Sequence, residues 1–214
     1  MTKNRTTDET TDETTDRTKG EATKPSADEV IAATRDWLEK AVIGLNLCPF
    51  AKAVYVKEQV RYVVSEATHL DGYLEDIDRE IELLAAADPQ QVDTTLIMHA
   101  SLLEDFLDFN DVLDLVDDAV TEHGHEGVLQ VAAFHPLWQF ADTEPDDIGN
   151  FTNRAPFPTI HLLREASVTR AVDAFPEAES IYERNIDTLE KLGLDGWRAL
   201  GLPVGLRSAS NAKS

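Results

Sequence analysis

Cysteine is almost absent from this chain of 214 residues, in which Cys48 is the single thiol. One cysteine forms no disulfide within the chain, which is typical of proteins from a reducing compartment. Long apolar runs are absent too, since none approaches the ~18 residues that a membrane-spanning helix needs. The first residues contain no apolar segment typical of a signal peptide. We therefore predict a cytoplasmic protein that does not interact with membranes.

Basic residues are scarce, with 19 Lys and Arg against 41 Asp and Glu, so the formal net charge is −22. A chain this negative repels phosphate backbones, and we predict no nucleic-acid partner. An acidic surface stays soluble when salt screens its self-repulsion, which favours a halophilic archaeon as the source. The alternative is an ordinary acidic cytoplasmic protein.

Several cofactor and metal motifs are also missing. No P-loop pattern and no GxGxxG pattern occurs, so a P-loop NTPase or a nucleotide-fold dehydrogenase has no support. Neither HExxH nor a paired CxxC is present, and His123 and His125 only flank Gly124 in a predicted turn. We predict no cofactor.

The chain divides into a tail, one domain and a short polar end. Residues 1–24 repeat Thr, Asp and Glu and hold no large apolar residue after Met1, so we predict a disordered acidic tail. A hydrophobic fraction of 42% is enough for one core, and we predict a single domain over residues 25–206. Residues 207–214 are small and polar, and we predict that they are disordered.

Hydrophobic periodicity predicts helices that alternate with strands. Capping-box patterns at Ser26 and Ser101 mark the starts of two helices. The predicted strands are Val60–Ser65, Thr94–His99, Val128–Phe134 and Thr159–Leu163. The predicted helices run from Ser26 until Cys48 and Pro49, from Asp71 to Ala87, from Ser101 to Val120, from Ser167 to Pro176, and from Ala178 until Gly193. The order αβαβαβ, long loop, βαα predicts an α/β fold with about four strands in a mixed or largely parallel sheet flanked by helices.

The segment from His135 to Pro158 contains no predicted element. Loops beyond ~12–15 residues without regular structure are uncommon and are usually functional or disordered. This loop contains aromatic side chains that favour packing over disorder, namely Trp138, Phe140, Phe151 and Phe157. It also follows a buried strand, where open α/β sheets tend to place ligands. We therefore expect the functional site between Phe134 and Arg164.

Two stretches resemble a known family. Residues 44–51 read GLNLCPFA, and residues 134–165 include FHP, QFAD and NRAPFPTIHLLRE. Both are similar to the bacterial and archaeal domain-of-unknown-function family 1415, and the resemblance covers residues 27–192. It implies no function, because the family has no settled one. Family members more often have Ser-Pro-Tyr-Pro where this chain has Ala155 to Pro158, which argues against a hydroxyl there being needed for chemistry.

Three residues are candidates for catalysis. His135 ends the third strand, where a neutral imidazole can act as general acid or base, or can instead be a structural, hydrogen-bonded residue. Cys48 with a remote histidine fits a nucleophile pattern, but the C-terminal end of a helix does not lower a thiol pKa. The alternative for Cys48 is a small buried apolar side chain. Asp147 would orient the reacting groups together with Asn150.

Substrate binding is predicted for a further set of polar residues. Arg154 and Arg164 are notable in so acidic a chain, and a guanidinium suits a carboxylate or phosphate. The alternative is internal pairing with Asp146, Asp147 or Glu165. The remaining candidates are Asn150 and Asn153, which can instead form turns, and His161, which can instead be a satisfied buried residue.

Four acids of the loop offer oxygen ligands for a divalent cation at close spacing, namely Asp142, Glu144, Asp146 and Asp147. The pattern is not an EF-hand, because the turn glycine and the final glutamate are missing. Since acidic residues occur throughout the chain, a solvated acidic loop is the better interpretation, and we predict no metal.

The leading hypothesis is a cytoplasmic enzyme that binds a small anionic or polar metabolite under the loop of residues 134–164. His135 would move protons, and Arg154 and Arg164 would hold the anion. One alternative is a non-catalytic binding or assembly module with internally paired arginines. Another is a hydrolase that depends on a divalent metal. The reaction, the substrate and the formation of a homo-oligomer stay open at this stage.

Overall fold

The computed structural model describes residues 24–174 and 180–205. It contains one four-stranded sheet built from β1 (Val60–Ser65), β2 (Thr94–His99), β3 (Leu129–Phe134) and β4 (Thr159–Arg164). The strands lie in the order β1-β2-β4-β3. β1 and β2 are parallel, whereas β4 runs antiparallel to both of its neighbours. The fold is therefore α/β with a mixed sheet, as the element order predicts.

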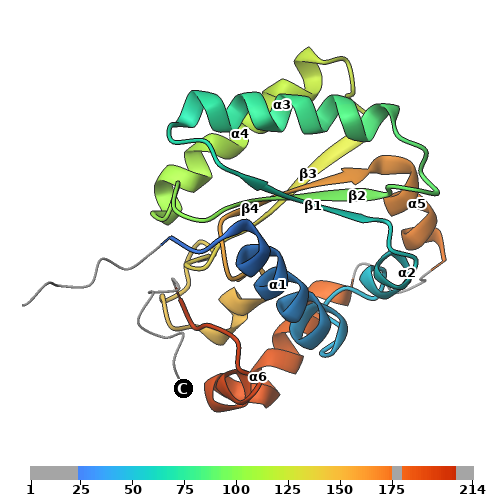
Figure 1. The fold of residues 1–214 in the computed structure, drawn as a ribbon. Coiled ribbons are helices and arrows are strands. Elements are labelled where there is room, and N and C mark those ends of the chain that lie inside the picture. Colours follow the sequence, from blue (N-terminus) through green and yellow to red (C-terminus); the bar gives the residue numbers. More distant parts are fainter. Residues whose placement is uncertain (1–23, 175–179, 206–214) are drawn as a thin grey trace, which may run out of the picture.

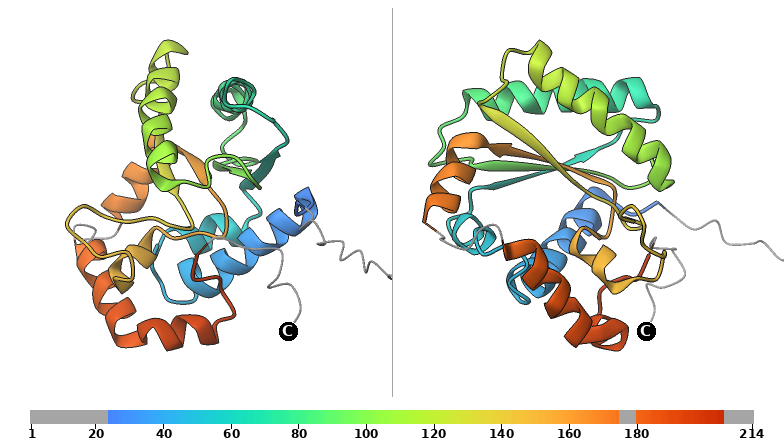
Figure 2. Two further views of the ribbon diagram at one scale, coloured as in Figure 1. Left: turned by 90° about the vertical axis from the view of Figure 1, so that its left-hand side faces the viewer. Right: turned by 180° about the vertical axis from the view of Figure 1, so that it is seen from behind.

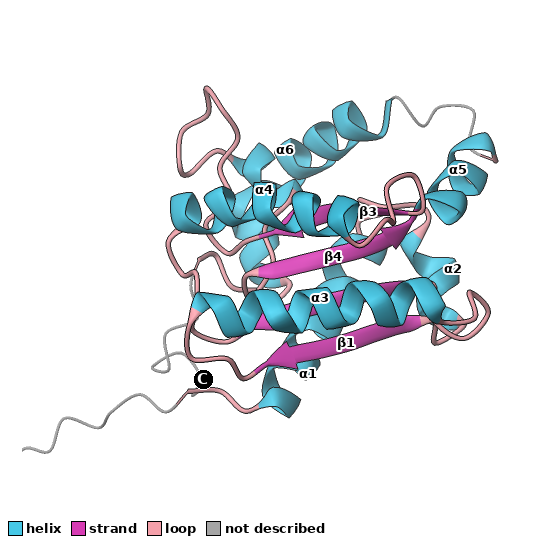
Figure 3. Ribbon diagram, turned by 90° about the horizontal axis from the view of Figure 1, so that it is seen from above, coloured by secondary structure: helices cyan, strands magenta, loops and turns pink. Residues whose placement is uncertain are grey.

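Helices cover both faces of this sheet. α3 (Leu70–Ala86) and α4 (Phe106–Glu122) lie over one face, as Figures 1 and 3 show. The other face carries α1 (Ala27–Trp37), the π-helix η1 (Leu38–Ile43) and α6 (Ile181–Ala199), with the 3-10 helix η2 (Ile148–Thr152) against α6 (Figure 2). α2 (Ala51–Val56) and α5 (Glu165–Asp173) lie near one end of the strands. No helix in the described ranges has the length and apolarity that a membrane crossing requires.

The apolar core has two parts, one on each face of the sheet. Alternation along β2 sends Leu96 and Met98 toward α1 and sends Ile97 toward α3 and α4. All six residues of β2 are buried, because helices cover this central strand on both sides. The sheet thus separates two layers of side chains. Successive residues along a strand belong to opposite layers.

The first helix begins as predicted and ends earlier. Ser26 and Glu29 form the capping box. The helix widens into η1 and stops at Gly44, before the predicted end at Cys48 and Pro49. The backbone then turns through Asn46, at φ 56°, and forms α2, which hydrophobic periodicity does not predict. A helix of six residues with no buried residue carries too weak a pattern to be found in a sequence.

The capping box predicted at Ser101 is wrong. α4 begins at Phe106, and the Asp105 carboxylate caps it by accepting from the backbone N–H groups of Leu107 and Asp108. The N–H groups of Ser101 and Leu102 donate to Nδ1 of His99 instead. The side chain of His99, two residues before Ser101, therefore accepts from these N–H groups in place of the cap that the pattern favours.

The last helix also differs from its prediction. Gly193 interrupts the helix as expected, with φ 65° and ψ 171°, but helical structure resumes and runs to Ala199. The helix starts at Ile181, and the first residues of the predicted segment lie outside the described residues, as do the predicted tails 1–23 and 207–214. The resumed turn carries Trp197, which is buried against Phe151 of the loop with ring centroids 4.9 Å apart.

Candidate functional site

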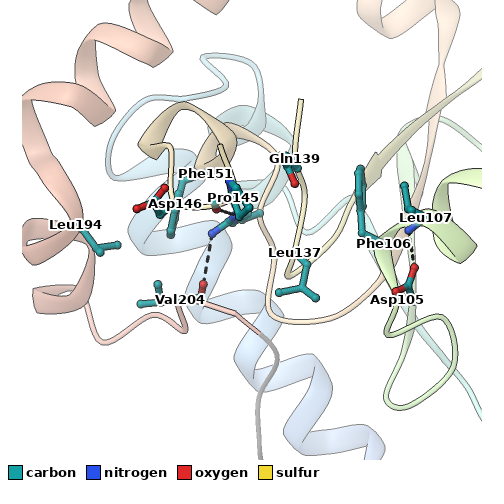
Figure 4. Close-up of a pocket in the computed structure, with 11 residues that line it drawn as sticks. Asp105, Phe106, Leu107, Leu137, Gln139, Pro145, Asp146, Phe151, Leu194 and Val204 are labelled. Carbon is teal, nitrogen blue, oxygen red and sulfur yellow. Dashed lines mark hydrogen bonds between the residues drawn. The ribbon is translucent and has the colours of Figure 1, made fainter. Parts of the chain in front are cut away.

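The loop between β3 and β4 borders a pocket of about 500 Å³. Its apolar walls come from three parts of the chain: Phe106 and Leu107 of α4, Leu137 and Phe151 of the loop, and Leu194 and Val204 near the end of the described chain. In Figure 4, Leu194 and Val204 lie on one side, Phe106 and Leu107 on the other, and Leu137 between them. Four polar side chains complete the lining, namely Asp105, Gln139, Asp146 and Arg154. The pocket is thus mostly apolar with a few polar groups, which is usual for a small-molecule site.

Arg154 is the buried cation of this pocket, with 8% of its surface exposed. Its Nε donates to the Trp138 carbonyl at 3.1 Å, and its two terminal nitrogens donate to the carbonyls of Pro145 and Val204. The guanidinium carbon lies 4.3 Å from the centre of the Phe151 ring. Burial lowers the pKa of Arg154, and the negative charge of Asp146 partly offsets this effect. In the described part of the chain, no carboxylate forms an ion pair with Arg154.

Asparagine side chains hold the loop in shape around the arginine. Oδ1 of Asn150 accepts from the Phe140 N–H at 3.0 Å and from the Thr143 hydroxyl at 2.9 Å, and its amide donates to the Glu144 carbonyl. Asn150 is fully buried, so these bonds use its polar atoms inside the loop. Asn153 donates to the Ala133 carbonyl and anchors the loop to β3. Asp147 caps η2 through the Gly149 N–H at 2.8 Å. These three predicted site residues therefore support the pocket and do not line it.

His135 lies behind the pocket wall. Its side chain is fully buried, with Nε2 donating to the Leu103 carbonyl at 2.9 Å and Nδ1 accepting from the Leu137 N–H at 3.0 Å. Desolvation lowers its pKa, which favours the neutral ring. The ring contacts Phe106, which does line the pocket, at a centroid distance of 5.5 Å. In this arrangement His135 positions two wall residues and has no free ring nitrogen for proton transfer.

The structure does not bring the two arginines together. Arg164 ends β4 at the opposite end from Thr159, where the loop joins the strand, and it is absent from the pocket lining. Its guanidinium donates to the carbonyls of Leu84, Ala87 and Val92, where α3 ends. A cation at a helix C-terminus complements the helix dipole. Arg164 therefore has a structural role at the end of α3. The geometry does not allow Arg154 and Arg164 to form one anion clamp.

His161 and Cys48 lie apart from the pocket as well. The Thr94 hydroxyl donates to the Leu162 carbonyl, so its oxygen accepts from Nε2 of His161, 2.6 Å away. Burial lowers the pKa of His161 to about 4. Cys48 packs in the layer of α1 and α6, whereas His135 packs on Phe109 of α4 across the sheet. Burial also raises the pKa of the Cys48 thiol, which disfavours a thiolate. The sheet thus separates Cys48 from its predicted partner.

The acids of the loop are accessible to solvent. Asp142, Glu144, Asp146 and Asp147 are all exposed. Among the described residues, no group of three or more histidine, cysteine or acidic side chains has the geometry to hold a metal ion.

Sequence reasoning missed half of the pocket. Asp105 appears in the sequence as an acidic residue on a helix, and Leu194 and Val204 lie beyond the predicted last helix. A signal for Leu194 did exist, because the apolar residues after Gly193 continue at helical spacing up to Trp197. His99 was also missed. It uses both ring nitrogens at the end of β2, as His135 does after β3, through the Ala67 carbonyl and the N–H groups of Ser101 and Leu102.

Comparison with known proteins agrees with the resemblance of the two stretches. A family model described as "Protein of unknown function (DUF1415)" matches residues 29–199. No curated protein and no solved structure matches the chain.

Proposed function

Because the chain belongs to the DUF1415 family, whose function is unknown, we propose from the pocket alone that it binds a small amphipathic molecule that carries an anionic group. The apolar part of the ligand would lie against Phe106, Leu137 and Leu194, and its anionic group would meet Arg154. The observation that carries this proposal is a buried guanidinium that lines an apolar pocket and has no carboxylate partner among residues 24–174 and 180–205.

A buried cation is costly unless hydrogen bonds and an opposite charge compensate it. Three carbonyls supply hydrogen bonds to Arg154 but no full negative charge. A guanidinium has five N–H donors, so the three carbonyl bonds leave donors for a ligand. A carboxylate or similar group in the pocket would meet these donors at close range.

The proposal assigns binding to Arg154 and assigns no proton transfer to His135. A reaction in the pocket would have to use a lining group that can exchange a proton, and Asp105 and Asp146 are such groups. The assembly-module alternative expects arginines paired with Asp146, Asp147 or Glu165. The guanidinium groups instead meet backbone carbonyls, and a pocket is present, which supports ligand binding over that alternative.

Isothermal titration with 3-phenylpropionate, hexanoate and L-phenylalanine tests this proposal. We expect at least one probe to bind, and Arg154→Gln to weaken binding about tenfold, because a hydrogen bond to a charged group contributes ~1.5 kcal/mol. Arg198→Gln is the matched control, since Arg198 is exposed and pairs with Asp195 away from the pocket. Arg198→Gln should bind like the wild type.

Arg154→Gln also removes hydrogen bonds that hold the loop, so this variant could fail to fold. A second variant tests the proposal without removing these bonds. Leu137→Glu changes a wall residue that is 38% exposed and places a negative charge in the apolar pocket. It should abolish binding of the anionic probes while circular dichroism stays unchanged. Wild-type protein that binds none of the three probes, or a Leu137→Glu variant that binds them normally, would refute the proposal.

A further inference from the structure

We infer that the ligand of this pocket is a zwitterion, an α-amino acid with an apolar side chain, whose carboxylate meets Arg154 and whose ammonium group meets Asp146. This inference rests on the proposed binding function and narrows its ligand class. It follows from how the charges around the pocket are distributed.

The pocket presents a positive and a negative group near each other. Arg154 and Asp146 both line it, and they lie close enough for the negative charge of Asp146 to offset part of the lowering of the Arg154 pKa by burial. The two side chains nevertheless form no ion pair, because Arg154 donates to backbone carbonyls and Asp146 is exposed. A ligand whose ammonium and carboxylate groups are attached to one carbon would offer each side chain the opposite charge. Such a ligand completes two interactions that the protein leaves incomplete.

The charge balance of the lining disfavours a simple anion. Two carboxylates, Asp105 and Asp146, share the pocket with one guanidinium. A phosphate or dicarboxylate would bring two negative charges into a lining that is already net negative, and like charges at an interface cost affinity. A monoanion without an ammonium group would gain Arg154 but would still face Asp146. A zwitterion removes this repulsion.

The Gln139 side chain and the apolar wall of the pocket also fit an amino acid. The Gln139 amide donates to the Thr143 carbonyl at 2.6 Å, so its oxygen stays available as an acceptor for an ammonium N–H. On the side away from Asp146, Phe106, Leu107 and Leu137 form an apolar wall, with Asp105 beside Leu107 (Figure 4). A leucine- or phenylalanine-sized side chain would bury its surface there, and a volume of about 500 Å³ accommodates either.

Isothermal titration tests the inference with three probes that share a phenyl group and differ in their charges, and with inorganic phosphate. L-phenylalanine carries both charges, 3-phenylpropionate only the carboxylate, phenethylamine only the ammonium group, and inorganic phosphate a multiple negative charge. We expect L-phenylalanine to bind about fivefold more tightly than either singly charged analogue, in line with ~1 kcal/mol for a partly exposed charge contact. Phosphate should not bind.

The Asp146→Asn variant tests whether Asp146 causes the preference for L-phenylalanine over 3-phenylpropionate. We expect it to weaken L-phenylalanine binding about fivefold and to leave 3-phenylpropionate binding unchanged or tighter. Asp142→Asn is the matched control, because Asp142 is an exposed acid of the same loop outside the pocket lining. It should change neither affinity.

The outcomes separate this inference from the binding proposal. If 3-phenylpropionate binds as tightly as L-phenylalanine, the anion site stands and the zwitterion is excluded. If phenethylamine binds most tightly, or if Asp142→Asn and Asp146→Asn weaken L-phenylalanine equally, the assigned pair of contacts is wrong. If no probe binds to the wild type, the binding proposal itself fails.

Discussion

Arg154 and Arg164 resemble each other in the sequence but have different tasks in the structure. Both are buried, with 8% exposure, and both donate to backbone carbonyls. Arg154 lines a pocket, where a ligand can reach it. Arg164 is enclosed between β4 and the connection from α3 to β2, where its donors serve the end of a helix. Access to the pocket therefore distinguishes the two roles, because both guanidiniums donate to carbonyls but only Arg154 lines the pocket.

Replacing Arg164 should destabilise the fold without changing the pocket. Arg164→Met leaves the carbonyls of Leu84, Ala87 and Val92 without their buried donor, and we expect the free energy of unfolding to fall by about 3 kcal/mol. Urea denaturation measures this change. Arg170→Met is the control, since the exposed Arg170 donates to the Ser167 hydroxyl within α5, and it should lose less than ~0.5 kcal/mol. Equal losses in the two variants would contradict the structural role of Arg164.

At the scale of elements, the bend in α6 positions one side of the pocket. Figure 2 shows that the helix changes direction, and Gly193 provides the bend with φ 65° and ψ 171°. This backbone region is open essentially only to glycine. Leu194 follows directly and lines the pocket, and Trp197 then packs on Phe151. The bend therefore connects the last helix to the loop.

Adding a methyl group at Gly193 should cost stability for conformational reasons alone. No heavy atom lies within 4 Å of a Cβ at this position, so Gly193→Ala introduces no clash. We expect a loss of about 2 kcal/mol in the free energy of unfolding, because alanine does not tolerate this φ and ψ. Lys191→Ala, at an exposed position in the same helix, should change stability by less than ~0.5 kcal/mol. If the urea midpoints of both variants equal that of the wild type, alanine adopts the backbone conformation of residue 193 without strain, and the prediction is wrong.

For the whole molecule, buried histidines set the stability on the acid side. Burial lowers the pKa of His99, His135 and His161, in the last case to about 4. The unfolded chain takes up these protons near pH 6.5, but the folded chain does not. The contribution of these histidines to the free energy of unfolding should therefore be fully present above pH 6.5 and should fall as the pH drops below it, for His161 down to about pH 4, by up to about 1.4 kcal/mol per pH unit for each histidine.

Urea denaturation at pH 7 and pH 5 checks this dependence. His161→Gln keeps a donor for Thr94 and removes the titration, so the difference between the two pH values should shrink. His123 provides a control of opposite sign, because its hydrogen bond to Glu82 raises its pKa, and its contribution is lost as the pH rises. His123→Gln should therefore not reduce the acid-side slope. A slope that is the same in the wild type and in His161→Gln would contradict the assignment.

The sequence by itself determined the strands, most helices and the packing of the long loop. β1 and β2 lie within their predicted bounds, because apolar alternation and β-branched residues act over a few neighbours. The aromatic residues of the loop also predict that it packs, and Phe151 and Phe157 are buried. Local periodicity is sufficient for such features, since each depends on residues that are close in the chain.

Only the tertiary structure decided which polar residues share a site. His135, Arg154 and Arg164 look equivalent in the sequence, yet one is held behind a wall, one lines the pocket and one caps α3. The pocket needs the start of α4, the loop and the turn after Gly193 to meet, and these segments are far apart along the chain. The physical reason is that contacts across the sheet depend on strand order and on the bend in α6, and no local pattern of residues contains either.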